Sequence, residues 1–182
     1  NANTCSDLDG DGEITVTDIA LLVNCIENED DVTRDNQTEP CEFGMSITNP
    51  NDTVQFSIGD VNLEEGYVDI HILNPDNEIL GYQFIMGNIS ITSVENLINN
   101  YPITPSFSNN GMVLGISYED SLIIKNYDPV PLCRIYYSSI SENTCIETII
   151  DVVNENYENV ISLNNTESCI PNTISVDNLN GN

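Results

Sequence analysis

Hydrophobic residues recur in short runs along most of the chain after its first 40 residues. The runs are rich in Ile, Val, Tyr and Phe and are divided by Asn, Asp, Gly and Pro, a pattern typical of β-strands joined by tight turns. The pattern predicts at most one short helix in this part, at 94–99, and strands at 43–47, 54–61, 67–73, 79–86, 89–94, 112–118, 132–138, 145–153 and 160–163. Nine short strands at this spacing favour a mainly β fold, a jelly-roll β-sandwich.

A different period marks the N-terminal part of the chain. Four apolar residues recur there at steps of three and four: Ile19, Leu22, Val23 and Ile26. This spacing predicts an amphipathic helix. We therefore divide the chain into a loop-helix module with its linker at 1–40, a β-sandwich at 41–170, and a tail at 171–182. In the tail, Ile174 and Val176 alternate with polar neighbours, as in a short strand that could add to the sheet of a neighbouring subunit.

The loop at the start of this helix, residues 7–18, reads DLDGDGEITVTD. A hard cation such as Ca²⁺ needs about six to eight oxygen ligands, which a tight loop supplies from alternate side chains, one backbone carbonyl and a closing carboxylate. In that scheme the ligands are Asp7, Asp9, Asp11, the carbonyl of Glu13, a hydroxyl or bridging water at Thr15, and Asp18. Gly12 stands where the turn needs a residue without a Cβ.

The alternative to a calcium site is an acidic surface turn without an ion. Three carboxylates this close repel one another strongly unless a cation neutralises them. Because the spacing, the glycine and the closing acid all agree, the sequence predicts an EF-hand-like calcium loop.

At these residues the chain resembles a dockerin repeat, whose pattern is an Asp-rich loop, a hydrophobic residue, a closing Asp and a short helix. The resemblance covers about the first quarter of the chain. Dockerins carry two such repeats, whereas the acidic stretch at 29–39 lacks the Asp-x-Asp-x-Asp-Gly core. The chain therefore departs from the family in having a single copy.

Residues 50–165 resemble a cohesin domain. The resemblance rests on a strand and polar turn followed by a Gly-x-Gln-Phe strand (Gly81, Gln83, Phe84), and on the later strand-like segments at 111–118 and 131–135. It implies a nine-stranded jelly roll that binds proteins and has no catalytic residues. Carbohydrate-binding modules share that architecture, so sugar binding remains open.

Charge narrows the choice of partners. The chain has 30 acidic and 3 basic residues, for a formal net charge of −27. Nucleic acid and anionic membrane surfaces would be repelled, whereas cations and neutral sugars would not. No apolar run is long enough to insert into a membrane as a spanning helix. We also expect the protein to lose stability when divalent ions are removed.

Six cysteines make an even count: Cys5, Cys25, Cys41, Cys133, Cys145 and Cys169. They form no Cys-x-x-Cys pair and the chain has one histidine, which argues against a zinc site. Six cysteines allow fifteen sets of disulfides, so the pairing stays open. The local pattern favours Cys133 with Cys145, Cys5 with Cys25, and Cys41 with Cys169.

Four sequons accompany the cysteines, at Asn36, Asn51, Asn88 and Asn164. Paired cysteines, glycosylation sites and a site that needs abundant calcium together predict an extracellular, secreted protein.

The sequence gives no sign of an enzyme. His71 lies in a predicted strand, opposite its apolar face, and no Gly-x-Ser-x-Gly motif accompanies it. Among 30 acids some carboxylate pairs lie close by chance, so a glycosidase pair is disfavoured, and we expect the few basic residues to meet local acids.

These features together predict a non-catalytic, calcium-stabilised structural subunit of an extracellular filament or surface assembly. Other copies of the same chain would be its partners, joined head to tail through dockerin-like and cohesin-like contacts or by strand addition. The alternative is a secreted module that binds carbohydrate or another protein.

Overall fold

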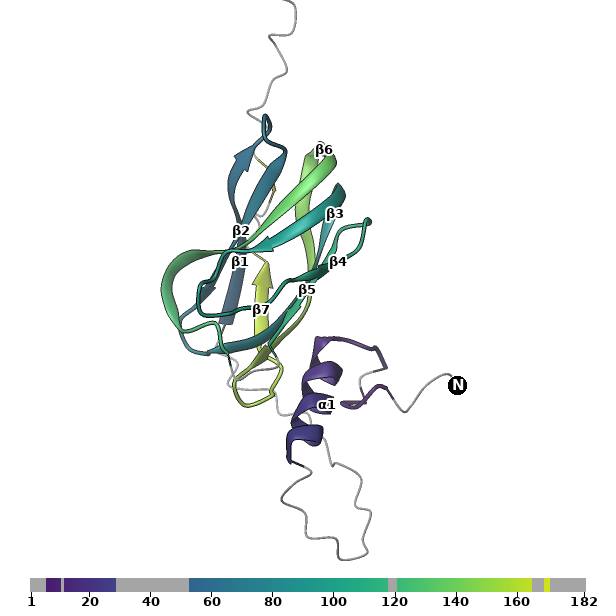
Figure 1. Cartoon of the computed structure of the whole chain (residues 1–182), viewed down its shortest axis with the longest axis vertical. Helices are drawn as coiled ribbons and strands as arrows, with labels where there is room; N and C mark the ends of the chain where they lie inside the picture. Colours follow the sequence, from purple (N-terminus) through teal and green to yellow (C-terminus); the bar gives the residue numbers. More distant parts are fainter. Residues whose placement is uncertain (1–5, 11, 29–52, 118–120, 165–168, 171–182) are drawn as a thin grey trace, which may run out of the picture.

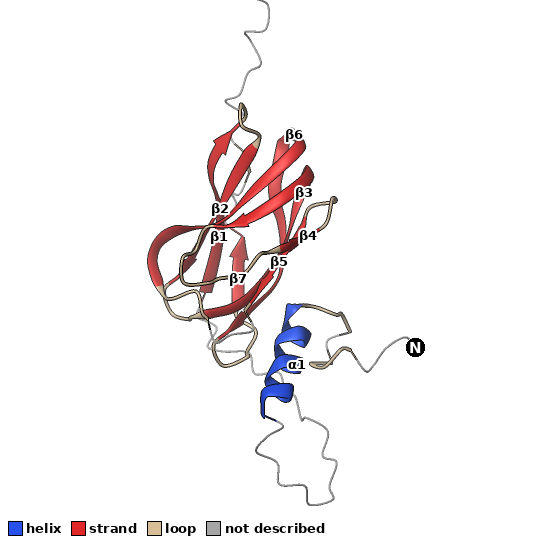
Figure 2. Ribbon diagram, in the orientation of Figure 1, coloured by secondary structure: helices blue, strands red, loops and turns tan. Residues whose placement is uncertain are grey.

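The computed structural model describes residues 6–10, 12–28, 53–117, 121–164 and 169–170. These residues form one helix, α1 (Val16–Asn28), followed by seven strands: β1 (Thr53–Asn62), β2 (Tyr67–Asn74), β3 (Ile79–Asn96), β4 (Ser106–Phe107), β5 (Met112–Ile116), β6 (Asn126–Asn154) and β7 (Ile161–Asn164). The helix lies beside one end of the strand-rich body (Figures 1 and 2). The strand predicted at 43–47 and the tail at 171–182 fall outside the described residues.

The strands form a hydrogen-bonded sheet in the order β4-β5-β3-β6-β2-β1-β7. All neighbours are antiparallel except β1 and β7, which are parallel. The long central pair, β3 with β6, changes register repeatedly. Each such bulge bends the strand and increases its twist, so the sheet curls over its own core (Figure 1). The predicted mainly β architecture is confirmed.

An aromatic cluster shows where the two halves of the sheet meet. Phe56 on β1 lies 5.8 Å from Phe84 and 6.4 Å from Tyr82 on β3, measured between ring centroids. In a flat sheet, strands three places apart would be separated by about 14 Å. The contact therefore requires the curled sheet, and it forms the centre of the main hydrophobic core, which Tyr101 joins by packing on Tyr82.

The structure joins several predicted strands into longer ones. Segments 79–86 and 89–94 are one strand, β3, which passes through a kink at Asn88, where φ is +57°. Asn tolerates this left-handed conformation better than most residues, so the chain bends without leaving the sheet. Segments 132–138 and 145–153 are likewise parts of β6. The helix predicted at 94–99 is wrong, because β3 continues to Asn96.

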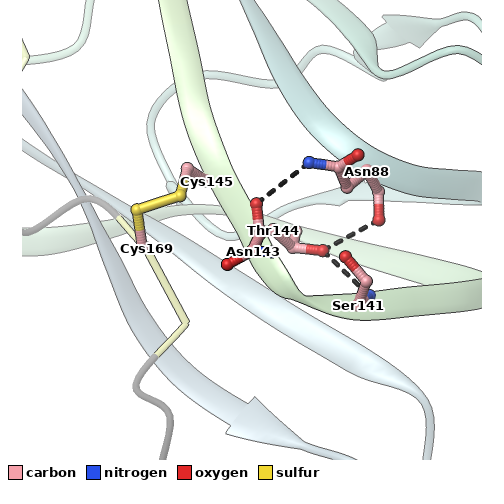
Figure 3. Close-up of a disulfide and its surroundings, with 6 residues drawn as sticks. All are labelled: Asn88, Ser141, Asn143, Thr144, Cys145 and Cys169. Atoms are coloured by element: carbon pink, nitrogen blue, oxygen red, sulfur yellow. Dashed lines mark hydrogen bonds between the residues drawn. A yellow bond between two sulfur atoms is a disulfide. The ribbon is translucent and has the colours of Figure 1, made fainter.

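The disulfide in the described part of the chain joins Cys145 on β6 to Cys169, beyond β7 (Figure 3). The predicted pairs of Cys133 with Cys145 and of Cys41 with Cys169 are therefore wrong. Cys133 is a free, buried thiol. It lies on the same continuous strand as Cys145, and an extended strand rises about 3.3 Å per residue, which carries the two sulfurs far apart. Cys25 is disulfide-bonded, while Cys5, its predicted partner, lies outside the described residues.

Hydrogen bonds support the bend of β6 just before this disulfide. The Thr144 hydroxyl donates to the carbonyl of Asn88 over 2.8 Å and accepts from the N–H of Ser141 (Figure 3). The side-chain amide of Asn88 donates to the carbonyl of Asn143. These bonds tie β3 to β6 where both strands bend, directly beside the disulfide.

Candidate functional site

Three of the predicted calcium ligands come together at the N-terminal end of α1. One carboxylate oxygen each of Asp7, Asp9 and Asp18 lies within 4.8 Å of the others. Asp7 and Asp9 are half-buried, and Asp18 is only 3% exposed. Asp11 lies outside the described residues, and Glu13 is exposed.

Hydrogen bonds to Asp7 shape the loop. Its carboxylate accepts from the N–H of Gly10 over 2.8 Å and from the N–H of Gly12 over 3.1 Å. Both glycines have positive φ, +79° and +95°, a conformation that side chains with a Cβ rarely adopt. The two glycines thereby fold the chain so that Asp7 faces Asp9 and the start of the helix.

Asp18 links the loop to the helix. Its carboxylate accepts from the N–H of Thr15 over 2.7 Å, while the Thr15 hydroxyl accepts from the N–H of Thr17 over 3.2 Å. This reciprocal arrangement is a capping box, which satisfies N–H groups that the first turn of a helix leaves without partners. The other oxygen of Asp18 accepts from the N–H of Leu8 over 2.5 Å. Asp18 therefore holds the loop and the helix start together.

The donor set fits a hard divalent cation. Ca²⁺ binds oxygen at about 2.3–2.6 Å, so two oxygens on one ion are separated by no more than about 5 Å. The separations between the carboxylates of Asp7, Asp9 and Asp18 meet that limit. Each carboxylate oxygen has two lone pairs, so an oxygen that accepts from a backbone N–H retains another for an ion.

A second cluster joins the helix start to the sheet. Asp151 on β6, 3% exposed, accepts from the Thr15 hydroxyl over 2.8 Å, from the Thr17 N–H over 3.2 Å, and from the Thr17 hydroxyl. On β3, the Gln83 side-chain oxygen accepts from the N–H of Val16 over 3.0 Å. Side chains of the sheet thus bind the first turn of α1, and an acid at this end of a helix is favourable.

Apolar contacts complete this docking surface. Val16 and Ala20 of α1 pack with Leu80, Ile116 and Val153 into a second hydrophobic cluster, separate from the main core.

Gly81 on β3 makes the close approach of α1 possible. A Cβ at this position would lie 2.9 Å from Cγ2 of Val16. We use the term docking face for the sheet residues beneath the helix: Leu80, Gly81, Gln83, Ile116, Asp151 and Val153.

The buried face of the helix matches the predicted apolar stripe only in part. Leu22 and Ile26 are 50% and 60% exposed, and Ile14 is 58% exposed. The hydrogen bonds of the first turn fix the rotation of α1, and they direct Val16 and Ala20 toward the sheet. The stripe predicted the helix correctly but its buried side only in part, because Ile19 packs against the second cluster while Leu22 and Ile26 stay exposed.

Sequence reasoning missed Asp151 as a site residue. A signal was present, because Asp151 is an acid within the apolar run 149–153. An acid flanked by apolar residues on a strand is seldom buried without a partner. The sequence could have shown that a partner was needed, but it could not have shown which residue it was.

The other predicted residues lie away from both clusters. Arg134 binds Asp69 through two hydrogen bonds of 2.7 and 2.9 Å, which confirms the expectation that it meets a local acid. Donation to the Asp69 carboxylate raises the pKa of the Arg134 guanidinium above its usual range. The guanidinium carbon also lies 3.7 Å from the centroid of the Tyr67 ring. His71 is half-buried and its ring lies over Gly59 of β1.

The predicted glycosylation sites are only partly described. Asn88 is exposed, and its amide donates to Asn143. Asn164 ends β7, and Asn36 and Asn51 fall outside the described residues. In the part of the chain that is described, no helix has the length and apolar character needed to cross a membrane.

Comparisons with known proteins give structural neighbours only. No family model and no curated protein matches the chain. Among solved structures, CaCohA2 from Clostridium acetobutylicum is 16% identical with a TM-score of 0.44, over 65% of this chain and 88% of its own. A chain of the CaDoc0917–CaCohA2 complex is 12% identical with a TM-score of 0.43, over 62% and 94%.

A third neighbour is a chain of the Coh-OlpC-Doc435 complex, a type I cohesin–dockerin complex from Clostridium thermocellum. It is 12% identical with a TM-score of 0.43, over 66% of this chain and 94% of its own. All three scores lie below the level at which two chains are taken to share a fold. The architecture therefore rests on the strand order and core described above.

Proposed function

We propose that the protein is a non-catalytic, calcium-stabilised structural subunit of an extracellular filament or surface assembly, in which copies of the chain join head to tail. Ca²⁺ would be held by Asp7, Asp9 and Asp18, with Asp11 and the carbonyl of Glu13 as further ligands. The ion would supply positive charge that relieves repulsion among these carboxylates. The contacts between subunits would be made by residues of the chain and not by the ion.

One observation carries the proposal. Asp18 belongs to the carboxylate cluster and also caps the helix whose first turn docks on the sheet. Cation binding at the cluster would therefore stabilise the same helix start that meets Asp151. A structural joint that depends on calcium requires a link of this kind.

The net charge argues against a nucleic-acid partner and makes association of copies dependent on cations. At a net charge of −27, copies of the chain repel one another unless cations or salt screen them. A calcium-rich medium outside the cell supplies such cations, and the disulfide of Cys145 with Cys169 is of the kind that persists there.

Carbohydrate binding is the second candidate. It has one specific support, the half-buried aromatic pair Tyr67 and Tyr136 on neighbouring strands. Their rings meet edge to face at 67°, whereas a platform for a sugar ring needs aromatic faces turned outward together. The geometry favours the structural role.

Electron microscopy of the full chain tests the proposed function. At high protein concentration with millimolar Ca²⁺ we expect strings or fibres, and with a chelator we expect separate particles. Separate particles under both conditions, together with binding to a glycan array, would favour the carbohydrate-binding alternative.

A further inference from the structure

The docking face and the helix that covers it are complementary, and each is incomplete alone. Within the described chain, every hydrogen bond to Oδ2 of Asp151 comes from Thr15 or Thr17. If the helix left, this buried carboxylate oxygen would lose all three donors, and the N–H of Val16 would lose its acceptor, the Gln83 side-chain oxygen. Leu80, Ile116 and Val153 would lose the Val16 and Ala20 side chains that cover them. A bare docking face would therefore favour any identical helix that reaches it.

The module's contribution to this contact is compact. It comes from one turn and its neighbours, residues 15–20: two hydroxyls, two N–H groups and two apolar side chains. A short unit of this kind can leave one sheet and bind another without changing its own fold. That is the property needed to exchange an element between identical subunits.

The chain between the module and the sheet is long enough for exchange. The 24 residues 29–52 join α1 to β1. With Cys25 bonded to Cys5, as the sequence predicts, these residues at about 3.3–3.6 Å each could span up to about 80 Å, which exceeds the diameter of a domain of this size. Covalent geometry therefore allows the module to reach the docking face of an adjacent copy.

Extending the proposed head-to-tail assembly, we propose that its joint is an exchange of this contact: the loop-helix module of one copy occupies the docking face of the next. The hydrogen bonds and apolar contacts are the same within one chain and between two, so exchange costs little in enthalpy. The contact within one chain is favoured by effective concentration, in the millimolar range for flexible connections. Exchange therefore prevails when chains are crowded.

The helix also has an exposed apolar side that contact between two copies could bury. Ile14, Leu22 and Ile26 remain exposed when α1 docks on its own sheet. Reciprocal exchange gives a closed dimer, and sequential exchange gives an open fibre.

A complementation experiment tests the exchange. Val16→Asp disables the helix side, since it places an acid beside Asp151 and among apolar residues, yet an acid in the first turn leaves the helix itself stable. Asp151→Ala disables the docking face. Each variant alone lacks one half of the contact, but a mixture contains one intact helix and one intact face on different chains. The full-length variants are mixed at high concentration with Ca²⁺ and sized by native mass spectrometry.

The exchange predicts a mixed dimer of about twice the 20.1 kDa chain mass, seen with the mixture and absent from either variant alone. If Asp151→Ala fails to fold, Gln83→Ala serves as a second variant of the docking face. Asp128→Ala is the matched control, because it removes an exposed acid from the same strand as Asp151. Mixed with Val16→Asp, it should form no more mixed dimer than the wild type does. Absence of a mixed dimer with both face variants would overturn the exchange. Assembly of the unmodified chain is measured separately. If the unmodified chain forms fibres but the variants form no mixed dimer, the proposed function stands and only the exchange of the helix is ruled out.

Discussion

Thr17, in the first turn of α1, donates both its backbone N–H and its hydroxyl to the buried carboxylate of Asp151, 134 residues further along the chain. The hydroxyl of Thr15 donates to the same oxygen. The start of the helix and β6, a central strand of the sheet, are thereby joined through one carboxylate. This relationship connects the carboxylate loop to the β-sandwich and underlies most of what we expect of the protein.

Loss of Asp151 should undock the helix. We expect Asp151→Ala to lower the free energy of unfolding by about 2–4 kcal/mol. The hydrogen bonds to a charged carboxylate would be lost, and with them the packing of the helix on apolar side chains of the sheet. Urea unfolding followed by circular dichroism measures the change. The matched substitution Asp128→Ala removes an exposed acid from the same strand and should stay within about 0.5 kcal/mol of the unmodified protein. Equal effects of the two would contradict the role given to Asp151.

The close approach at Gly81 predicts coupling between strand and helix. We expect Gly81→Ala to cost about 1–3 kcal/mol, because its new Cβ would lie 2.9 Å from Val16 Cγ2. In a Val16→Ala background that atom is gone, so the same substitution should cost distinctly less. A double-mutant cycle of unfolding free energies measures this coupling. If the two substitutions add without coupling, the helix does not pack on Gly81 as described.

Calcium should stabilise the fold. Binding to the native loop at about 100 times the dissociation constant adds about 2.7 kcal/mol to the unfolding free energy, and the melting temperature should rise accordingly. Thermal melts with Ca²⁺ and with a chelator measure the difference. The double variant Asp7→Asn with Asp9→Asn should lose it, while Asp60→Asn, an exposed acid on β1, should keep it. A chelator that leaves the unmodified protein's melting temperature unchanged would rule out a calcium site of consequence.

The sequence predicted what depends on neighbouring residues and missed what depends on distant ones. The loop could be predicted because its aspartates, glycines and closing acid are consecutive, and the structure brings Asp7, Asp9 and Asp18 together. The pairing of Thr17 with Asp151 could not be predicted, because nothing local specifies a partner 134 residues away.

The strand boundaries failed for a related reason. Gly87 and Asn88 look like a turn in the sequence, but in the structure they are a kink that β6 continues to pair with. Whether such a pair ends a strand or bends it depends on the partner strand. The disulfides show the same limit, since Cys145 pairs across the fold with Cys169 rather than with its nearer neighbour in sequence.

The buried thiol predicts how stability changes with pH. Burial raises the pKa of Cys133 well above its usual range, and the negative charge of Asp69 adds to the effect. The folded state therefore keeps this proton at a pH where the unfolded chain releases it. The resulting stabilisation is complete below the unfolded pKa of about 8.5 and declines above it, by about 1.4 kcal/mol per pH unit.

Cys133→Ala should accordingly flatten the loss of unfolding free energy between about pH 9 and pH 10, measured by urea unfolding at each pH. Iodoacetamide provides an independent reading, because Cys133 should be alkylated only after unfolding. Rapid alkylation of the native protein, located by mass spectrometry, would contradict the burial of this thiol.

Sedimentation velocity of the full chain over a wide range of protein concentration shows whether copies associate and whether Ca²⁺ is required. With Ca²⁺, we expect the sedimenting mass to rise with concentration from that of a 20.1 kDa chain to dimers and longer species. A chelator, or Asp7→Asn combined with Asp9→Asn, should prevent the rise. A single species at the mass of one chain, at every concentration and with Ca²⁺ present, would contradict the proposed assembly.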